Sequence, residues 1–264
     1  AAVAVTFIFV NLVVAAPQQK PCVTGEDAVN AFINALTENN KDELLTIFGA
    51  DANELVSSGD EIIDQRRREI FVKAYDEQHK LDVDGNSLVI VVGKNEWPFP
   101  IPLVKQSEQW VFDTNSGKEE ILNRRIGRNE LDAIQVMLAI VDAEREYAMK
   151  GSDNNGLPEY AQKFRSDPGK KNGLYWETKE GEGPSPLGSL ISQAKQEGYL
   201  KNESAEGPQP YHGYFYRILT AQGANAPSGS FDYIVDGNMI GGFAVVAYPA
   251  DFGNSGVMTF MVNH

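Results

Sequence analysis

The segment of residues 121–149 constrains the fold more than any other part of the sequence. Between Leu131 and Val141 only Asp132 and Gln135 are polar. A helix of this composition is apolar almost all the way round, which is typical of a helix buried inside a domain rather than lying on its surface. The sequence therefore predicts a long central helix against which the rest of its domain packs.

The chain after this segment has the pattern of an antiparallel sheet. Asn129 is expected to be the N-cap of the helix, because its side chain can accept a hydrogen bond from a free backbone N–H. Strand-forming stretches separated by Gly, Pro, Asn and Asp follow at residues 211–220, 231–235, 240–248 and 257–262. These patterns predict a C-terminal domain, residues 117–264, in which the long buried helix packs on an antiparallel sheet.

Residues 26–116 predict an N-terminal α+β domain. Apolar residues recur with helical spacing in residues 26–36, 41–48 and 62–79, and strands are expected at 80–84, 87–92, 101–106 and 109–113. Asp84-Gly85-Asn86 is a hairpin turn signal. Helices followed by an antiparallel meander resemble the cone-shaped folds of the NTF2-like kind. The expected fold class is therefore α+β with two domains.

The charge balance narrows the choice of partners. The chain has 264 residues and a formal net charge of -14, whereas nucleic-acid binding requires clustered Lys and Arg. We therefore expect no nucleic-acid partner. An acidic surface suits a cationic partner or a divalent metal. The alternative is that the net negative charge serves only to keep the protein soluble. Cys22 is the single cysteine, so no internal disulfide can form.

The first residues have the pattern of an export signal. An apolar run at residues 3–14 precedes Ala15 and Ala16, as in the apolar region and cleavage site of a secretory signal peptide. The run is too short for a stable membrane span. We expect residues 1–16 to be this signal, or an apolar segment retained as an anchor or as a strand donated to another sheet, and residues 17–25 to be a linker. The expected location is the periplasm or the cell surface of a bacterium.

Trp97 and Phe99 stand among alternating prolines in residues 97–102. Proline cannot donate a hydrogen bond to a neighbouring strand, so this segment is expected at a sheet edge or in an extended loop. The two aromatic side chains then have two interpretations. They form a platform for a peptide or glycan, or they cap the core of the sheet while the prolines protect its edge.

Arg124, Arg125 and Arg128 form the one basic cluster in this acidic sequence. One interpretation is an anion clamp at the N-terminus of the central helix. The other is structural, in which the three arginines pair with Glu119, Glu120 and Asp132 and lock the joint between the two domains.

Residues 151–159 have part of the pattern of a calcium-binding loop. If Gly156 occupies the sixth position of such a loop, Asp153, Asn155 and Glu159 fall at liganding positions. The first and twelfth positions lack their usual acidic ligands. The alternative is a polar turn that caps the end of the central helix. The possible cofactor is calcium.

Several motifs resemble the bacterial domain-of-unknown-function family 2950 (DUF 2950). They span nearly the whole chain after residue 16 and lie at residues 97–102, 124–130, 142–148, 173–176, 212–223 and 256–260. The resemblance implies an exported protein of a Gram-negative bacterium, and it implies no particular activity. The second half alone is also similar to the globular domains of type IV pilins and pseudopilins, although a pilin's apolar segment runs directly into its long helix.

The sequence contains no recognised catalytic motif. His212 stands among tyrosines and is either a general base in a cleft or a structural histidine at a strand end. We expect a non-catalytic binding or interaction protein, with another protein or further copies of itself as partner. The alternatives are a self-assembling structural subunit and an enzyme with a pocket in the NTF2-like domain.

Overall fold

The computed structural model confirms an α+β protein and describes residues 19–150, 158–199 and 208–264. The chain forms two compact units. Unit 1 comprises the described residues up to Val56 together with Val72–Gly117, and unit 2 comprises Ser57–Phe71 and Lys118–His264. Residues 57–71, which the sequence patterns place with the N-terminal domain, thus belong to the unit that contains the C-terminal sheet.

The helices of unit 1 begin where the capping residues predict. The Thr24 side chain accepts a hydrogen bond from the backbone N–H of Asp27, and the Asn40 side chain accepts one from that of Glu43. Both contacts satisfy a backbone donor that the helix leaves free. The helices are α1 (Gly25–Thr37), α2 (Lys41–Phe48), a 3-10 turn η1 (Ala50–Ala52), α3 (Asn53–Val56) and the C-terminal part of α4 (Glu61–Glu77).

Five antiparallel strands form the sheet of unit 1. They are β1 (His79–Asp84), β2 (Ser87–Val92), β3 (Trp97–Pro98), β4 (Leu103–Gln106) and β5 (Gln109–Phe112), in the order β1-β2-β4-β5 with β3 beside β2. Gly85 has φ +57°, which the tight turn between β1 and β2 requires and which glycine adopts at little cost. The hairpin expected at this position is therefore present.

Four phenylalanine rings fill the interior of unit 1. Phe32 of α1 and Phe48 of α2 contact Phe99, directly after β3, and Phe112 of β5, with ring centroids 5.1–6.4 Å apart. All four side chains are buried. Edge-to-face and tilted ring contacts at these distances are favourable beyond the burial of area alone.

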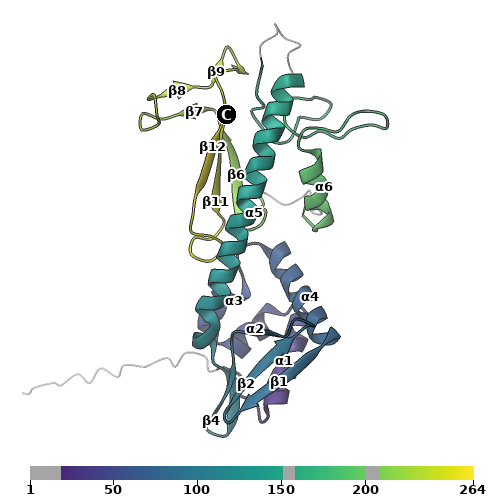
Figure 1. Cartoon of the computed structure of the whole chain (residues 1–264), viewed down its shortest axis with the longest axis vertical. Coiled ribbons are helices and arrows are strands. Elements are labelled where there is room, and N and C mark those ends of the chain that lie inside the picture. The colour runs from purple at the N-terminus through teal and green to yellow at the C-terminus, as the bar shows by residue number, and fades with distance from the viewer. Residues whose placement is uncertain (1–18, 151–157, 200–207) are drawn as a thin grey trace, which may run out of the picture. The chain divides into compact units, whose positions relative to one another are not determined.

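Unit 2 is built on the long helix α5 (Thr114–Lys150), which begins at the end of unit 1. Within unit 2, α5 lies along a three-stranded antiparallel sheet (Figure 1). Its strands are β6 (Tyr214–Leu219), β11 (Ala244–Pro249) and β12 (Phe260–Asn263), in the order β12-β11-β6. The remaining elements of the C-terminal part are α6 (Gly188–Gln196), β7 (Ala221–Gln222), β8 (Phe231–Asp232), β9 (Ile234–Val235) and β10 (Asn238–Met239).

The core of unit 2 lies between one side of α5 and one face of this sheet. Val136, Met137 and Ile140 of the helix belong to the same buried cluster as Tyr214 of β6 and Val245 of β11. Side chains four residues apart on a helix share a face, as do alternate residues on a strand. The helical spacing therefore gives α5 one apolar face, the alternation along each strand gives the sheet another, and the two faces pack together.

The expectation that the middle of α5 is buried on all sides is wrong. Leu131, Ile134 and Leu138 are exposed, with 67%, 38% and 52% of their surface open to solvent, while Val141 is buried. The sheet covers one side of the helix, and these three residues lie on the other. Asn129 is not an N-cap either, because α5 begins at Thr114 and Asn129 lies fully buried inside the helix.

Among the described residues, none of the helices combines the length and the apolar content needed to cross a bilayer.

Candidate functional site

The most unusual surface of unit 2 is an apolar stripe on α5, which we define as Leu131, Ile134 and Leu138. The spacing of these residues places them on one face of the helix, where adjacent turns bring their side chains together. Arg128 precedes the stripe by about one turn and Asp142 follows it by about one turn, and both are exposed. The stripe is thus an apolar centre between two charged ends.

A loop from the sheet side extends the exposed apolar surface near this helix. The backbone N–H groups of Val257 and Met258 donate hydrogen bonds of 3.1 and 3.0 Å to Oε1 of Glu130, which precedes Leu131. The side chains of Val257 and Met258 are exposed, as is that of Met261 on β12. The bonds to Glu130 fix the position of this loop against α5.

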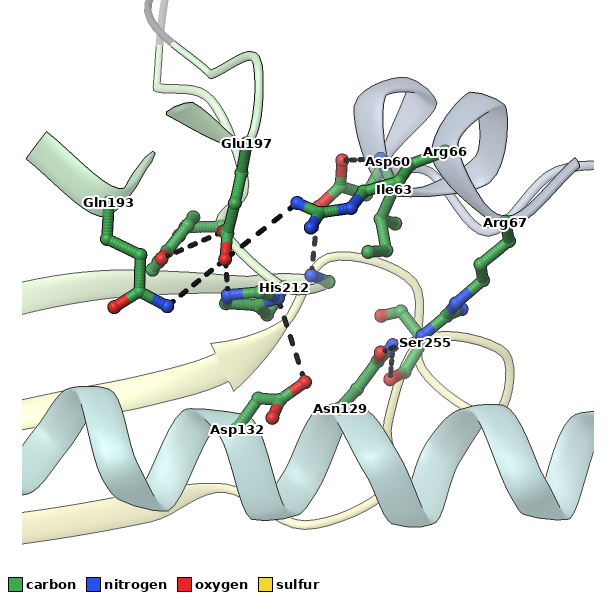
Figure 2. A network of polar contacts seen from close by, with 12 residues as sticks. Asp60, Ile63, Arg66, Arg67, Asn129, Asp132, Gln193, Glu197, His212 and Ser255 are labelled. Atoms are coloured by element: carbon green, nitrogen blue, oxygen red, sulfur yellow. Dashed lines mark hydrogen bonds and ion pairs between the residues drawn. The ribbon is translucent and has the colours of Figure 1, made fainter. Parts of the chain in front are cut away.

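A network of polar side chains surrounds His212 (Figure 2). Figure 2 shows the imidazole between two carboxylates, with Nε2 3.2 Å from Oε2 of Glu197 and Nδ1 3.7 Å from Oδ2 of Asp132. The Tyr211 hydroxyl and the Gln193 amide also donate to the Glu197 carboxylate, at 3.1 Å each. The side chains of His212 and Glu197 are only 13% and 14% exposed, whereas that of Asp132 is 39% exposed.

Asp60 is the centre of the adjoining part of the network. Its carboxylate accepts hydrogen bonds from the Tyr199 hydroxyl at 2.8 Å and from the backbone N–H groups of Gly213 at 3.0 Å and Ile63 at 3.2 Å. Burial raises the pKa of Asp60, while these three donors oppose the shift. The bonds join the start of α4, the end of the α6 region and the turn before β6.

Gly213 occupies a position that only glycine fits. Its φ is +76°, and an added Cβ would lie 2.5 Å from Nδ2 of Asn129. Asn129 accepts a hydrogen bond from Arg67 Nη2 and donates one to the backbone carbonyl of Ser255, both at 2.8 Å. The helix, the turn and the loop at Ser255 therefore meet at this buried amide.

The three arginines of the predicted basic cluster do not act together. Arg124 is exposed and forms an ion pair of 2.6 Å with Glu120 within the helix. Arg125 is buried and donates to Oδ1 of Asn254. Burial lowers the pKa of Arg125 to about 10, which leaves it charged at neutral pH. Arg128 is exposed beside the apolar stripe.

Trp97 and Phe99, the proposed aromatic platform, have different environments. Phe99 is part of the phenylalanine core of unit 1, whereas Trp97 on β3 is half-buried with its ring centroid 6.3 Å from that of Phe99. Their positions correspond to the interpretation in which the two side chains cap the core of the sheet.

The calcium loop stays a prediction. Asp153 and Asn155 lie outside the described residues, and Glu159 is half-buried at the start of the next described segment. In residues 19–150, 158–199 and 208–264, His, Cys, Asp and Glu side chains form no group of three that could hold a metal ion.

The apolar stripe is the part of the candidate site that the sequence patterns missed. A signal for it was present, because a helix against one sheet has only one face to bury, while residues 131–141 are apolar at positions all round the helix. Glu144 was missed as well. It lies fully buried in unit 2, with Oε2 accepting a bond of 2.8 Å from the backbone N–H of Ala161.

Burial raises the pKa of the Glu144 carboxyl to about 8, against the opposing effect of the single backbone hydrogen bond. Its second oxygen, Oε1, has no hydrogen-bond partner among the described residues. A neutral carboxyl tolerates this environment much better than a carboxylate does. Glu144 is therefore protonated in the folded protein at pH values below about 8.

Comparison with known proteins gives a family and nothing beyond it. No curated protein and no solved structure matches the chain. The similarities to pilins and to NTF2-like folds therefore stay predictions. The sequence model of a protein family of unknown function matches residues 19–264, which is more than nine-tenths of the chain. This match confirms the resemblance seen in the motifs, and the chain belongs to the family DUF2950.

Proposed function

We propose that this protein acts by binding another protein chain through the apolar stripe of α5, and that it performs no catalysis. The observation that carries the proposal is the exposure of Leu131, Ile134 and Leu138 on a single helix face. Single exposed apolar residues are common on protein surfaces, but contiguous ones mark interaction sites.

The surroundings of the stripe support the same function. Arg128 and Asp142 stand at its two ends, so that an apolar centre is bordered by charged residues. Protein interfaces have this arrangement, with charged side chains depleted at the centre and present at the rim. The regular helix also holds the stripe in one conformation before a partner arrives, which lowers the entropic cost of binding.

The other candidate regions give less support to an enzyme. Unit 1, where the alternative hypothesis places a pocket, has Phe32, Phe48, Phe99 and Phe112 in mutual contact in its interior. The His212 imidazole is largely buried, and each of its ring nitrogens faces a carboxylate of this chain, that of Glu197 or that of Asp132. A general base must instead reach a proton of the substrate.

The proposed location is the periplasm or the cell surface. The apolar run of residues 3–14, followed by Ala15 and Ala16, supports export by its similarity to a secretory signal. An exported, acidic, non-catalytic interaction protein is consistent with every feature on which the proposal rests.

Photo-crosslinking from the helix surface tests this function. A photoreactive amino acid replaces Gln135, which is exposed next to Ile134, in the full chain within the cells that produce it. A matched control carries it at Glu108, an exposed position in unit 1. We expect discrete crosslinked products from position 135 alone, and their loss when Leu131→Asp is added. The same weak pattern from both positions contradicts the proposal.

A further inference from the structure

We infer that the partner bound by the apolar stripe is a second copy of this chain, whose α5 packs antiparallel against the first across a two-fold axis. The inference rests on the proposed function and names its partner. In such a contact the same surface is used by both copies, so the surface must be complementary to itself.

The apolar residues of the stripe meet this requirement. Leu131 lies three residues before Ile134, and Leu138 lies three residues after Gln135. The stripe is therefore symmetric about the midpoint between Ile134 and Gln135. A two-fold axis at this midpoint places Leu131 of one copy against Leu138 of the other, and brings the two Ile134 side chains together at the centre.

The charges at the ends meet the same requirement. Arg128 and Asp142 are nearly equidistant from the midpoint, one on each side, and both are exposed. An antiparallel second copy brings Arg128 beside Asp142 at both ends of the contact. A parallel copy would instead place Arg128 beside Arg128 and Asp142 beside Asp142, which is unfavourable.

The next charged residues outward do not oppose this arrangement strongly. Arg124 and Arg145 face one another across the antiparallel pair, but Arg124 has Glu120 beside it in its own helix, and Arg145 shares Asp142 with Arg128 of the second copy. Arg124 pairs with Glu120 at 2.6 Å, and Arg145 lies 4.0 Å from Asp142.

Gly127 supplies an independent observation on the same face. It lies exposed in the interior of α5, and a Cβ added there would meet no atom within 4 Å. Glycine destabilises a helix interior relative to alanine, and no contact among the described residues requires it at this position. In the antiparallel pair Gly127 faces the Asp142 turn of the second copy, where the missing side chain lets the two backbones approach.

The contact is small. Stable interfaces bury roughly 800 Å² on each partner, more than three aliphatic side chains on one helix provide. We therefore expect a dimer with a dissociation constant in the micromolar range, which forms when the protein is concentrated.

Charge reversal with sedimentation equilibrium tests the pairing of the ends. Arg128→Asp and Asp142→Arg should each weaken the dimer by about tenfold, because two attractive contacts become repulsive in the symmetric pair. The double variant, which restores opposite charges, should dimerise nearly as well as the wild type. Thermal melting of each variant, monitored by circular dichroism, checks that the fold is retained.

Cysteine crosslinking tests the direction of the helices in the full chain with Cys22→Ser. Ile134→Cys, at the axis, should give a disulfide-linked dimer on mild oxidation. Met149→Cys, also exposed on α5, should not, because the two positions would lie roughly 40 Å apart along an antiparallel pair. Dimers from both positions would show a parallel contact and overturn the inference.

A wild type that stays monomeric at high micromolar concentration also overturns the inference. If crosslinking from position 135 still captures one different protein, the proposed function stands and only the identity of the partner is wrong. If position 135 captures nothing, both the function and the inference fail.

Discussion

The two faces of α5 have similar apolar side chains and opposite environments. Val136, Met137 and Ile140 are packed against the sheet of unit 2, while Leu131 and Leu138 face solvent. Hydrophobicity alone therefore does not identify which apolar residues a chain buries in its own fold. Apolar residues that the fold leaves exposed are available to a partner.

The polar residues of the same helix sharpen this contrast. Asn129 and Glu144 lie fully buried on the sheet side, whereas the side chains of Leu131, Ile134 and Leu138 are exposed on the other side. An ordinary amphipathic helix has the reverse distribution. The buried polar side chains form hydrogen bonds within the chain, and the exposed apolar side chains are available to a second molecule.

The largest expected difference is between two truncations of aliphatic side chains on the two faces. Ile140→Ala removes a side chain from the buried cluster and should lower the free energy of unfolding by about 2–5 kcal/mol. Leu138→Ala should change it by no more than about 0.5 kcal/mol. Urea denaturation of dilute protein measures both. Equal losses would mean that the exposed face is buried in solution.

The second prediction concerns the pH dependence that Glu144 imposes. Its folded pKa of about 8 exceeds the ordinary glutamate pKa of 4.5, so the folded state binds the proton more tightly. The stability contribution is complete below pH 4.5 and is lost as the pH rises through 8. The wild type should lose roughly 3 kcal/mol of unfolding free energy between pH 5 and 8. Glu144→Gln should abolish this loss.

Thermal or urea unfolding at several pH values measures this effect. Glu146→Gln, two residues further along α5 and paired with Lys150 at the surface, is the matched control and should keep the wild-type profile. A Glu144→Gln variant whose stability falls with pH as steeply as that of the wild type would refute the assignment.

The third prediction uses a glycine beside the buried face. Gly213→Ala forces a side chain into a left-handed conformation and toward the Asn129 amide, which should cost roughly 2 kcal/mol of unfolding free energy. The midpoint of urea denaturation measures it. A neutral result would mean that the turn before β6 does not hold Asn129 in the way described.

Gly127, on the exposed face, gives the smallest effect and the opposite sign. Gly127→Ala should raise the unfolding free energy of the monomer by about 1 kcal/mol, because alanine favours the helix and has open space there. The same change should weaken the dimer measured by sedimentation. If Gly127→Ala stabilises the monomer but leaves the dissociation constant of the dimer unchanged, Gly127 does not take part in the contact between copies.

Local sequence patterns predicted the elements that depend on local interactions. The cap at Thr24 and the turn at Gly85 are set by residues within a few positions, and the α+β class follows from the alternation of such elements. The start of α5 was misplaced because Asn129 resembles a cap in sequence, whereas in the fold its side chain bonds to Arg67 and Ser255.

The candidate site depended on contacts that no local pattern contains. Asp60 bonds to Tyr199 and Gly213 across 139 and 153 residues. Adjacent arginines in the sequence were expected to act together, but Arg124 and Arg125 point about 100° apart on a helix, and one is exposed while the other is buried. The exposure of Leu131 likewise depends on which helix face the sheet covers.

The most direct test of the central claim is carbene footprinting of the stripe in the wild-type protein at low and at high concentration. Leu131, Ile134 and Leu138 should be labelled in dilute protein and protected when it is concentrated, while Met149 stays labelled and Ile140 stays protected throughout. Labelling of the stripe that does not change with concentration, or protection already in dilute protein, would contradict an exposed face that a second copy covers.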